Sequence, residues 1–366
     1  MRGTSRKGIL LILLALSNLF LVSSLLSVRS VAATGSESPL TSHHGIAIHS
    51  DKEFILANGV VSGSGTQADP YVIASWDIDV SADPVPVILS SGTLNAGIFI
   101  ANTTAYVIVR NVQVHSSIPG WWMNVGIVLW NTTNVVVESS RVWNGNNGVV
   151  LVATSRSTIV QNEFFNQVEP VAIVGGFPLA SSKASGNIIA QNTIHGGRAV
   201  GIEVFDASDN VITDNSIWNM SAWAAFFQGG ANGNIFSGNH ISSSAVGIEA
   251  VFSSINNTIV GNSFDVQILG VGVGFGSNGT IVTGNNIHSI QGGINLIEVT
   301  NSIVSGNTVQ ANGTGIKLLE GTTANRITGN LVIAHIGLFV CGTIIGLNRF
   351  APNDLKGSDL RMEFCH

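Results

Sequence analysis

The sequence predicts an all-β protein, a single right-handed parallel β-helix of about 11 coils with a cap at each end. Three observations predict this fold class. A short phrase of apolar residues around an asparagine recurs at a nearly constant interval along the 366 residues. The composition favours strands over helices, and the interval is too short to hold a crossover helix between repeats.

The repeated phrase is apolar-x-x-Asn-x-apolar. Its clearest copies centre on Asn162, Asn192, Asn215, Asn239, Asn262, Asn285, Asn307 and Asn330. The steps between them are 30, 23, 24, 23, 23, 22 and 23 residues. A second phrase, Gly-Ile-x-apolar, follows several copies, as at Gly201 and Gly247. Each repeat therefore holds short alternating strands, which predicts one coil of about 23 residues, stacked on its neighbours at roughly 4.8 Å.

The repeated asparagine has a structural explanation. Asparagine tolerates the left-handed backbone of a bend between strands, and its amide can hydrogen-bond to the asparagine of the next coil. We therefore predict a ladder of asparagines and assign these side chains no chemistry.

The composition excludes several classes of protein. Hydrophobic residues make up 45% and charged residues 10%, with 42 glycines, 2 cysteines and a formal net charge of −6. A disordered chain would be less hydrophobic, and a helical bundle would hold less Gly, Asn, Val, Ile and Thr. A protein that binds nucleic acid would present a basic face, so we expect no nucleic-acid partner.

The N-terminus has the pattern of an export signal. Arg2, Arg6 and Lys7 precede an apolar run over residues 9–26, and small residues follow up to Ala33. This predicts a signal peptide over residues 1–33, or an uncleaved N-terminal anchor, and hence a secreted, periplasmic or cell-surface protein.

The remaining chain divides into three predicted parts. Residues 34–75 form an N-terminal segment and cap, residues 76–340 the β-helix repeats, and residues 341–366 a C-terminal cap. Cys341 and Cys365 lie one repeat apart, and an oxidising compartment favours a disulfide between them.

The repeats resemble those of the pectate-lyase-like superfamily, and more narrowly its NosD-like, "carbohydrate-binding and sugar hydrolysis" subgroup of secreted bacterial and archaeal proteins. The resemblance covers roughly residues 46–350. In residues 59–73, the Gly-Ser-Gly-Thr and Asp-Pro-Tyr stretches are similar to the segment that opens many archaeal surface proteins of this group. The resemblance implies the fold but not one activity, since lyases, hydrolases, epimerases and adhesins share it. The motif sets of polygalacturonase-like enzymes and pectate lyases are missing from the sequence.

Alignment of the repeats puts rings in one outward column. The column contains His115, Trp143, Phe165, His195 and Trp218, followed by Ser242, Asp265, His288 and Gln310. A long insertion after His115 adds Trp121 and Trp122. Aromatic side chains suit flat sugar rings, so the seven ring-bearing residues form a candidate substrate-binding platform. Alternatively, the insertion folds over the column and buries it.

A second column contains candidate catalytic residues. Glu203 and Glu249 are predicted two coils apart, near 9.6 Å at roughly 4.8 Å per coil, which is just compatible with the roughly 6.5–9.5 Å between the carboxyls of inverting glycosidases. Phe226 lies between them in the alignment and could raise the pKa of one carboxyl. The alternative is that both are ordinary solvated carboxylates.

Metal binding rests on few residues. NosD-like proteins have been linked to the maturation of copper centres, and His43, His44 and His49 are candidate ligands near the N-terminus. No His/Cys cluster has the spacing of a zinc site, and neither copper nor calcium has a ligand cluster in the sequence. We therefore expect no cofactor and no metal.

Three functions remain open. The leading hypothesis is an exported, monomeric, non-catalytic module that binds a polysaccharide or cell-surface glycan, with membrane contact only through an uncleaved N-terminal segment. The second is a polysaccharide hydrolase, lyase or epimerase that uses Glu203 and Glu249. The third is a structural surface protein or a copper-maturation accessory.

Overall fold

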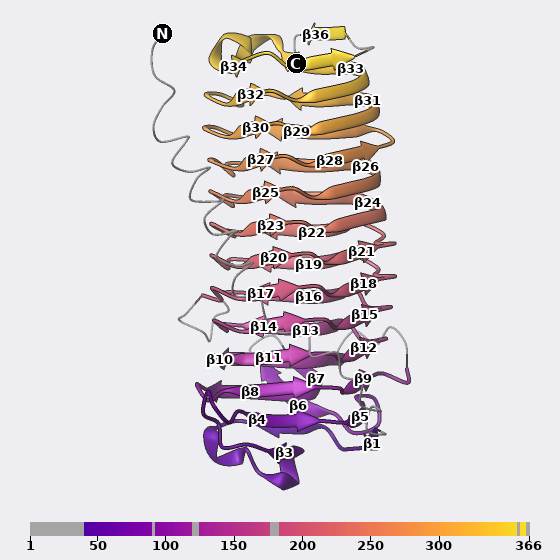
Figure 1. Ribbon diagram of the computed structural model, residues 1–366, viewed down its shortest axis with the longest axis vertical. Coiled ribbons are helices and arrows are strands. Elements are labelled where there is room, and N and C mark those ends of the chain that lie inside the picture. Colours follow the sequence, from indigo (N-terminus) through magenta and orange to yellow (C-terminus); the bar gives the residue numbers. More distant parts are fainter. Residues whose placement is uncertain (1–39, 90–91, 119–123, 176–182, 357–358, 364–366) are drawn as a thin grey trace. The chain divides into compact units, whose positions relative to one another are not determined.

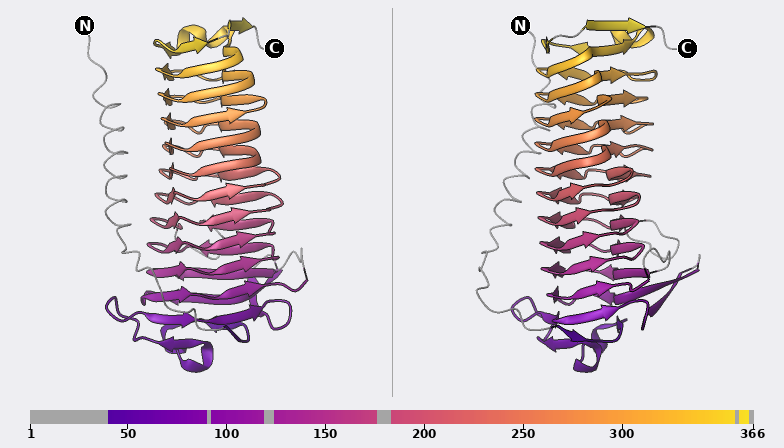
Figure 2. Two further views of the ribbon diagram at one scale, coloured as in Figure 1. Left: turned by 45° about the vertical axis from the view of Figure 1, so that its right-hand side comes forward. Right: turned by 90° about the vertical axis from the view of Figure 1, so that its right-hand side faces the viewer.

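The computed structural model describes residues 40–89, 92–118, 124–175, 183–356 and 359–363. They belong to one compact unit, Leu40–His366, in which the chain winds through a stack of coils (Figures 1 and 2). The coils pair by parallel strands almost throughout the described residues. This confirms the predicted all-β right-handed parallel β-helix.

Three parallel faces run along the stack, which we call sheets 1, 2 and 3. Sheet 1 consists of β3 (Val60–Ser62), β4 (Tyr71–Ala74), β8 (Val107–Arg110), β11 (Val135–Glu138), β14 (Thr158–Val160), β17 (Ile188–Ala190), β20 (Val211–Thr213), β23 (Ile235–Ser237), β25 (Thr258–Val260), β27 (Ile281–Thr283), β30 (Ile303–Ser305), β32 (Arg326–Thr328) and β34 (Arg349–Phe350). Only the pair β3–β4 is antiparallel among the described strands of this sheet.

Sheets 2 and 3 meet at a bend that some strands cross without a break. Sheet 2 consists of β1 (Thr41–Ser42), β5 (Trp76–Asp79), β9 (Gln113–His115), β12 (Arg141–Trp143), β15 (Glu163–Phe165), β18 (Thr193–His195), β21 (Ser216–Trp218), β28 (Asn286–Ser289) and β35 (Asp354–Lys356). Sheet 3 consists of β2 (Ile46–Ile48), β6 (Val85–Leu89), β7 (Gly92–Thr103), β10 (Asn124–Thr132), β13 (Asn147–Val152), β16 (Glu169–Val174), β19 (Val200–Phe205), β22 (Trp223–Gln228), β29 (Gly292–Ile297) and β36 (Asp359–Glu363). The strands β24 (His240–Ala250), β26 (Ser263–Gly274), β31 (Thr308–Leu318) and β33 (Leu331–Cys341) belong to both.

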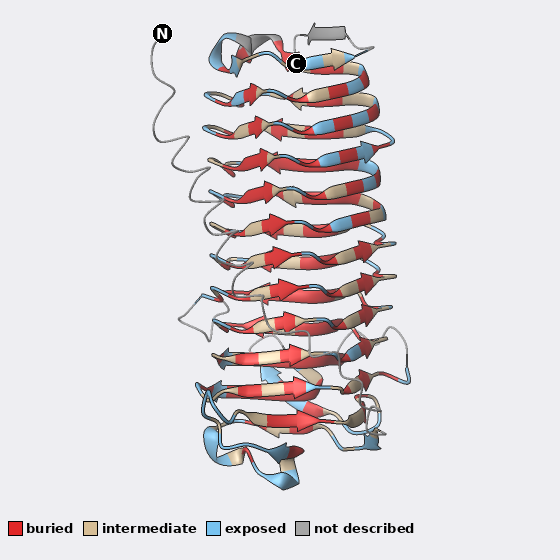
Figure 3. Cartoon of the chain, in the orientation of Figure 1, coloured by how far each residue is buried: buried red, intermediate tan, exposed pale blue. Residues whose placement is uncertain are grey.

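The core lies inside the coils and is continuous from end to end, as the red band along the strands in Figure 3 shows. Each strand points alternate side chains inward, so one apolar residue per strand repeats in every coil. In sheet 2 the inward residues include Val142, Phe164 and Ile194, all at 1% exposure or less. Their period of about one coil is the physical origin of the repeated phrase in the sequence.

The predicted asparagine ladder is present inside the bend between sheets 1 and 2. Each Nδ2 donates to the Oδ1 of the asparagine in the next coil, for example from Asn239 to Asn262 at 3.1 Å. The same Nδ2 also donates to backbone carbonyls, as Asn262 does to Phe236 at 2.8 Å. The ladder continues to Asn353, beyond the last predicted copy.

One detail of that prediction is wrong. The left-handed residue of the bend is not the asparagine but the residue before it, such as Gln161 (φ 57°), Asp214 (φ 55°) or Gly238 (φ 62°). The asparagine itself is selected for its buried amide, which pairs with backbone groups that the bend leaves without strand partners.

A second asparagine ladder was not predicted. It lies five residues before the first and contains Asn187, Asn210, Asn234 and Asn257, then Asn325 and Asn348. Thr280 and Ser302 take the corresponding places in the coils between. The signal was available as a second asparagine at a fixed offset, but its substitution by Ser and Thr obscured it.

Both ends of the described unit differ from the regular coils. At the N-terminal end, β1 and β2 pair with β5 and β7, and the short helices η1 (Asp51–Glu53) and η2 (Leu56–Asn58) lie next to the hairpin β3–β4 (Figure 1). At the C-terminal end, the short helix η3 (Gly342–Leu347) precedes β34, β35 and β36, which continue the parallel pairing. The segment expected to be a C-terminal cap therefore contains a further coil.

Candidate functional site

The outward face of sheet 2 carries the predicted column of rings. The backbone registers pair His115 with Trp143, Trp143 with Phe165, Phe165 with His195 and His195 with Trp218. These five side chains, which we call the ring ladder, lie on consecutive strands β9, β12, β15, β18 and β21. The structure therefore brings together all of the predicted column that it describes, while Trp121 and Trp122 lie outside the described residues.

The rings stack on one another face to face. From His115 to Trp218 the centroids are 4.7, 5.5, 5.3 and 4.6 Å apart, with interplanar angles of 14°, 6°, 5° and 4°. Because each inner ring is covered on both faces, only its edge points to solvent. The ladder is thus a half-buried stack rather than an open row of ring faces.

Charged side chains flank the ring ladder. Nε of Arg141 lies 2.6 Å from Oε2 of Glu163, and the guanidinium lies 5.6 Å from the ring centroid of Trp143 and 5.5 Å from that of Phe165. Burial raises the pKa of Glu163, but the hydrogen bonds from Arg141 and His195 outweigh it and hold the carboxyl below its usual value. The first ring is paired too, since Nε2 of His115 lies 3.2 Å from Oδ1 of Asp77.

Asp79 precedes His115 in the same column and fixes the turns beside it. Its Oδ1 accepts hydrogen bonds from the backbone N–H groups of Ser81 at 2.9 Å and Ser117 at 3.1 Å, and from the hydroxyl of Ser81 at 2.5 Å. Burial raises the pKa of Asp79, but these bonds dominate and lower it to about 2. The N-terminal end of the ring ladder is therefore held by an ionised carboxylate.

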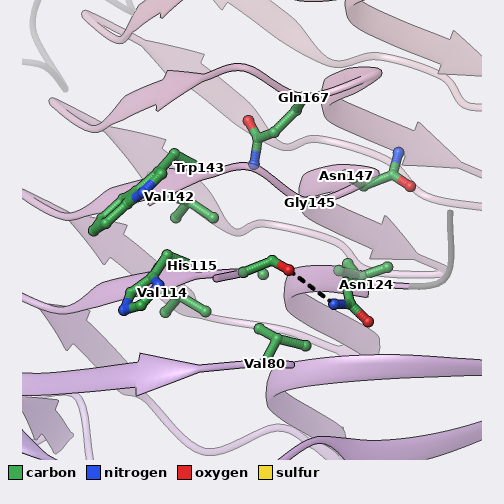
Figure 4. A pocket seen from close by; sticks show the side chains of 12 residues that line it. Val80, Val114, His115, Asn124, Val142, Trp143, Gly145, Asn147 and Gln167 are labelled. Carbon is green, nitrogen blue, oxygen red and sulfur yellow. Dashed lines mark hydrogen bonds between the residues drawn. The ribbon is translucent and has the colours of Figure 1, made fainter. Parts of the chain in front are cut away.

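A small void lies behind the first two rings. Figure 4 shows His115 and Trp143 on one side of it and Asn124 and Asn147 on the other. Its empty volume is about 160 Å³, yet it is too narrow for a water molecule. The amide of Gln167, which is fully buried, reaches this void without a hydrogen-bond partner among the described residues. The void belongs to the packing beneath the ladder and is no ligand site.

Sheet 3 carries the two candidate catalytic carboxyls. The registers pair Glu203 with Phe226 and Phe226 with Glu249, so the two carboxyls lie two coils apart, as predicted. Strand β22, which lies between them, supplies a donor to each. Nε2 of Gln228 lies 2.7 Å from Oε1 of Glu203, and Nε1 of Trp223 lies 2.9 Å from Oε2 of Glu249.

Both carboxyls have raised pKa values. Burial is the main cause for each; the neighbouring Glu169 raises the pKa of Glu203 further, while the bond from Gln228 opposes the shift. For Glu249 the bond from Trp223 opposes the effect of burial. Sequence reasoning missed Glu169, Trp223 and Gln228, although the last two lie in the same strand as Phe226.

The candidate metal ligands do not converge. The ring of His43 lies 4.5 Å from that of Trp76, His44 pairs with Asp83, and His49 lies 3.0 Å from Glu53. Across the described residues, no group of three or more His, Cys, Asp or Glu side chains is arranged to hold a metal ion. These residues do not fit a copper centre, and we derive no chemistry through one.

The other predicted features fall mostly outside the described residues. Residues 1–33 and Cys365 are not described, so the signal peptide and the disulfide stay predictions, although Cys341 is fully buried. In the described ranges, no helix is long and apolar enough to cross a membrane.

Two protein families match the chain in succession. Residues 96–264 match the family "Right handed beta helix region", and residues 267–363 match "Periplasmic copper-binding protein (NosD)". This is a NosD-like parallel β-helix protein. The boundary between the matches falls inside one continuous stack of coils, so the two families describe a single β-helix.

Solved structures show the same fold. A double mutant of the periplasmic alginate epimerase AlgG is 14% identical, with a TM-score of 0.60 over 94% of this chain and 98% of that one. A mutant of DFA-IIIase from Arthrobacter chlorophenolicus A6, in complex with DFA-III, is 13% identical, with a TM-score of 0.53 over 70% and 72% of the two chains. The chain spans 36% of XylC, with 16% identity and a TM-score of 0.43. No curated protein sequence matches. At these identities the neighbours establish the β-helix fold and leave the activity open.

Proposed function

We propose that the protein is an exported, monomeric, non-catalytic module that binds a neutral polysaccharide through the outward face of sheet 2. The observation that carries this proposal is the ring ladder. It runs along five consecutive coils and ends in an indole, Trp218, on whose far face no further ring stacks among the described residues. Aromatic rings beside hydrogen-bonding groups are the usual contact surface for sugars.

The charge of this face favours a neutral glycan. Asp77, Asp79, Glu163 and Asp265 line the two outward columns, against the guanidinium of Arg141, and Asp354 and Lys356 add one charge of each sign in the last coil. A polyuronate would be repelled by this face and by the net charge of −6. The same carboxylates accept hydrogen bonds from sugar hydroxyls.

Export is supported by the basic and apolar pattern of residues 1–33 and by the periplasmic description of the family that matches residues 267–363. An exported protein meets polysaccharide of the cell surface or matrix, which is consistent with the proposed ligand.

Affinity electrophoresis tests the proposal. The purified protein is run through native gels that contain cellulose derivatives, xylan, mannan or alginate, and each gel is then stained for loss of polymer. Retardation by a neutral polymer without clearing is the expected result. Retardation by alginate alone would contradict the charge argument. No retardation by any polymer would overturn the proposal and favour a structural or copper-accessory function.

A second candidate, a polysaccharide-active enzyme, rests on the raised pKa values of Glu203 and Glu249. A carboxyl with a raised pKa can act as a general acid, and a second carboxyl nearby as a general base. Cleared zones in the stained gel would support this candidate. Full clearing by Glu249→Gln would exclude Glu249 from the chemistry.

A further inference from the structure

The ring ladder stops although its column continues. The register pairs Trp218 with Ser242, Ser242 with Asp265, Asp265 with His288 and His288 with Gln310. Ser242 thus occupies the place where the ladder has held a ring in five successive coils. A serine side chain is far smaller than a ring. An open position therefore lies over Ser242, next to the far face of Trp218.

The open position over Ser242 is thick enough for one ring. Two coils separate Trp218 from Asp265, which is about 9.6 Å at roughly 4.8 Å per coil. Within the ladder the rings are 4.6–5.5 Å apart, so a ring midway over Ser242 would lie at the same spacing from Trp218. Carbon atoms in contact are about 3.5–4.0 Å apart, which leaves room for a puckered ring.

Asp265 and His288 form the far wall of this position, which is polar and exposed to solvent. Oδ1 of Asp265 lies 2.7 Å from Nδ1 of His288, and their side chains are 67% and 54% exposed. The second Asp265 oxygen has no hydrogen-bond partner among the described residues and is free to accept from a ligand. In the neighbouring outward column, Ser216 and Ser263 flank the exposed His240, so on that side small side chains and one imidazole border the position.

The backbone also departs from the regular repeat here. The pairing of β24 with β26 shifts register between Ser242 and Ser244 and again between Ser244 and Val246. Such irregularities in a strand re-aim side chains and are frequent beside functional sites.

We propose that one pyranose ring of a neutral glycan occupies the ladder position over Ser242, stacked on the far face of Trp218 and hydrogen-bonded to Asp265. This inference rests on the proposed function and names its central subsite. A sugar fits the position better than a planar aromatic ligand, because one wall is an indole and the other a carboxylate with an imidazole. The glycan continues along the column towards Gln310, which is exposed.

The test fills the position with the kind of side chain that the ladder holds elsewhere. Binding of cellohexaose, xylohexaose and mannohexaose is measured by isothermal titration calorimetry for the wild type and for Ser242→Trp. The expected result is at least tenfold weaker binding of whichever hexasaccharide the wild type binds. The matched control is Ser305→Trp, which makes the same substitution at an outward, half-buried position of sheet 1 and leaves the sheet 2 column unchanged, so its affinity should stay within about twofold.

A second variant protects the test against misfolding of Ser242→Trp. Asp265→Asn keeps the shape of the far wall and removes its charge, and we expect binding to weaken about fivefold or more. If the wild type binds none of the three hexasaccharides and is retarded by no neutral polymer, the proposed function itself fails. If the wild type binds and both Ser242→Trp and Asp265→Asn bind as tightly, the subsite is overturned while the proposed function stands.

Discussion

The inner asparagine ladder and the outer ring ladder follow the same coils but differ in persistence. The asparagines pair without interruption from Asn162 to Asn353, and each of them up to Asn330 is buried. The rings occupy only five coils, from His115 to Trp218, and give way to polar side chains. The two ladders are built by the same register, so the difference lies in what each position requires.

From Asn162 to Asn353, the inner position needs the same side chain in every coil. An inward bend leaves backbone groups without strand partners, and only an amide of the right length satisfies them. The outer position has no such requirement, since Ser242 and Asp265 take it without disturbing the core beneath them. Folding does not require a ring in the outer column, so ligand binding can determine where rings occur. The coil at which the rings end is the proposed subsite.

The largest effect is expected in the inner ladder. Asn262→Ala removes bonds to Phe236, Val260 and Asn285. It also removes the Oδ1 that accepts from the backbone N–H and from Nδ2 of Asn239. Several buried groups would lose partners, so we expect a loss of about 3 kcal/mol or more in the free energy of unfolding. Urea denaturation measures it. Asn286→Ala, at an exposed site in the next coil, is the control and should change stability by less than about 0.5 kcal/mol.

The second-largest effect is expected from the close packing of backbone and side chains inside the coils. A Cβ on Gly293 would lie 2.2 Å from Cγ1 of Val309 and 2.4 Å from the carbonyl oxygen of Gly315. Gly293→Ala should therefore cost about 2–3 kcal/mol through overpacking against backbone. Gly284 is left-handed but has open space around its Cβ position, so Gly284→Ala should cost only about 1 kcal/mol. Urea denaturation measures both free energies of unfolding. Equal losses of stability in the two variants would show that the interior is less tightly packed than the structure indicates.

A smaller effect is expected in the outer ladder. Trp143→Ala removes two stacked ring contacts and one contact with the guanidinium of Arg141. At about 0.5–1.5 kcal/mol for each ring pair, the loss should be about 2 kcal/mol, measured by thermal denaturation. Gln310→Ala changes the same column where no ring stands and should leave stability unaltered. A loss above that of Asn262→Ala would reverse the comparison between the ladders.

The smallest effect concerns the N-terminal end of the ring ladder. Because folding lowers the pKa of Asp79 to about 2, its stabilisation is complete above the unfolded value near 3.8 and is lost as the pH falls from 4 towards 2. Asp79→Asn should lower stability at pH 6 by about 1 kcal/mol or less, since the group is partly exposed. Melting temperatures of wild type and variant should converge near pH 2. Parallel curves from pH 6 to pH 2 would contradict the assignment.

The fold could be predicted because its requirements repeat. Inward residues such as Phe164 and Ile194 recur once per coil, and the asparagine interval gives the coil length. The same alignment predicted the register of the ring ladder and of Glu203 with Glu249, since a parallel stack pairs residues one repeat apart. The second asparagine ladder was hidden because Thr280 and Ser302 replace asparagine in two coils.

Side-chain orientation could not be predicted from the repeat. The sequence places Trp143 and Phe165 next to each other but does not say whether their faces meet or point outward, because that depends on rotamers and on the flanking Arg141. The raised pKa of Glu249 likewise depends on burial, and its hydrogen bond on Trp223 from another coil. The column was therefore predicted, while its stacked geometry came from the structure.

The central claim is that the end of the ring ladder, and not its interior, recognises the glycan. Affinity electrophoresis of Trp218→Ala and Trp143→Ala in the same neutral-polymer gel tests it most directly. Trp218 has an uncovered face and Trp143 has none, so we predict that Trp218→Ala loses most of its retardation while folded Trp143→Ala keeps it. Equal retardation of both variants and the wild type, or selective loss in Trp143→Ala, would contradict the account.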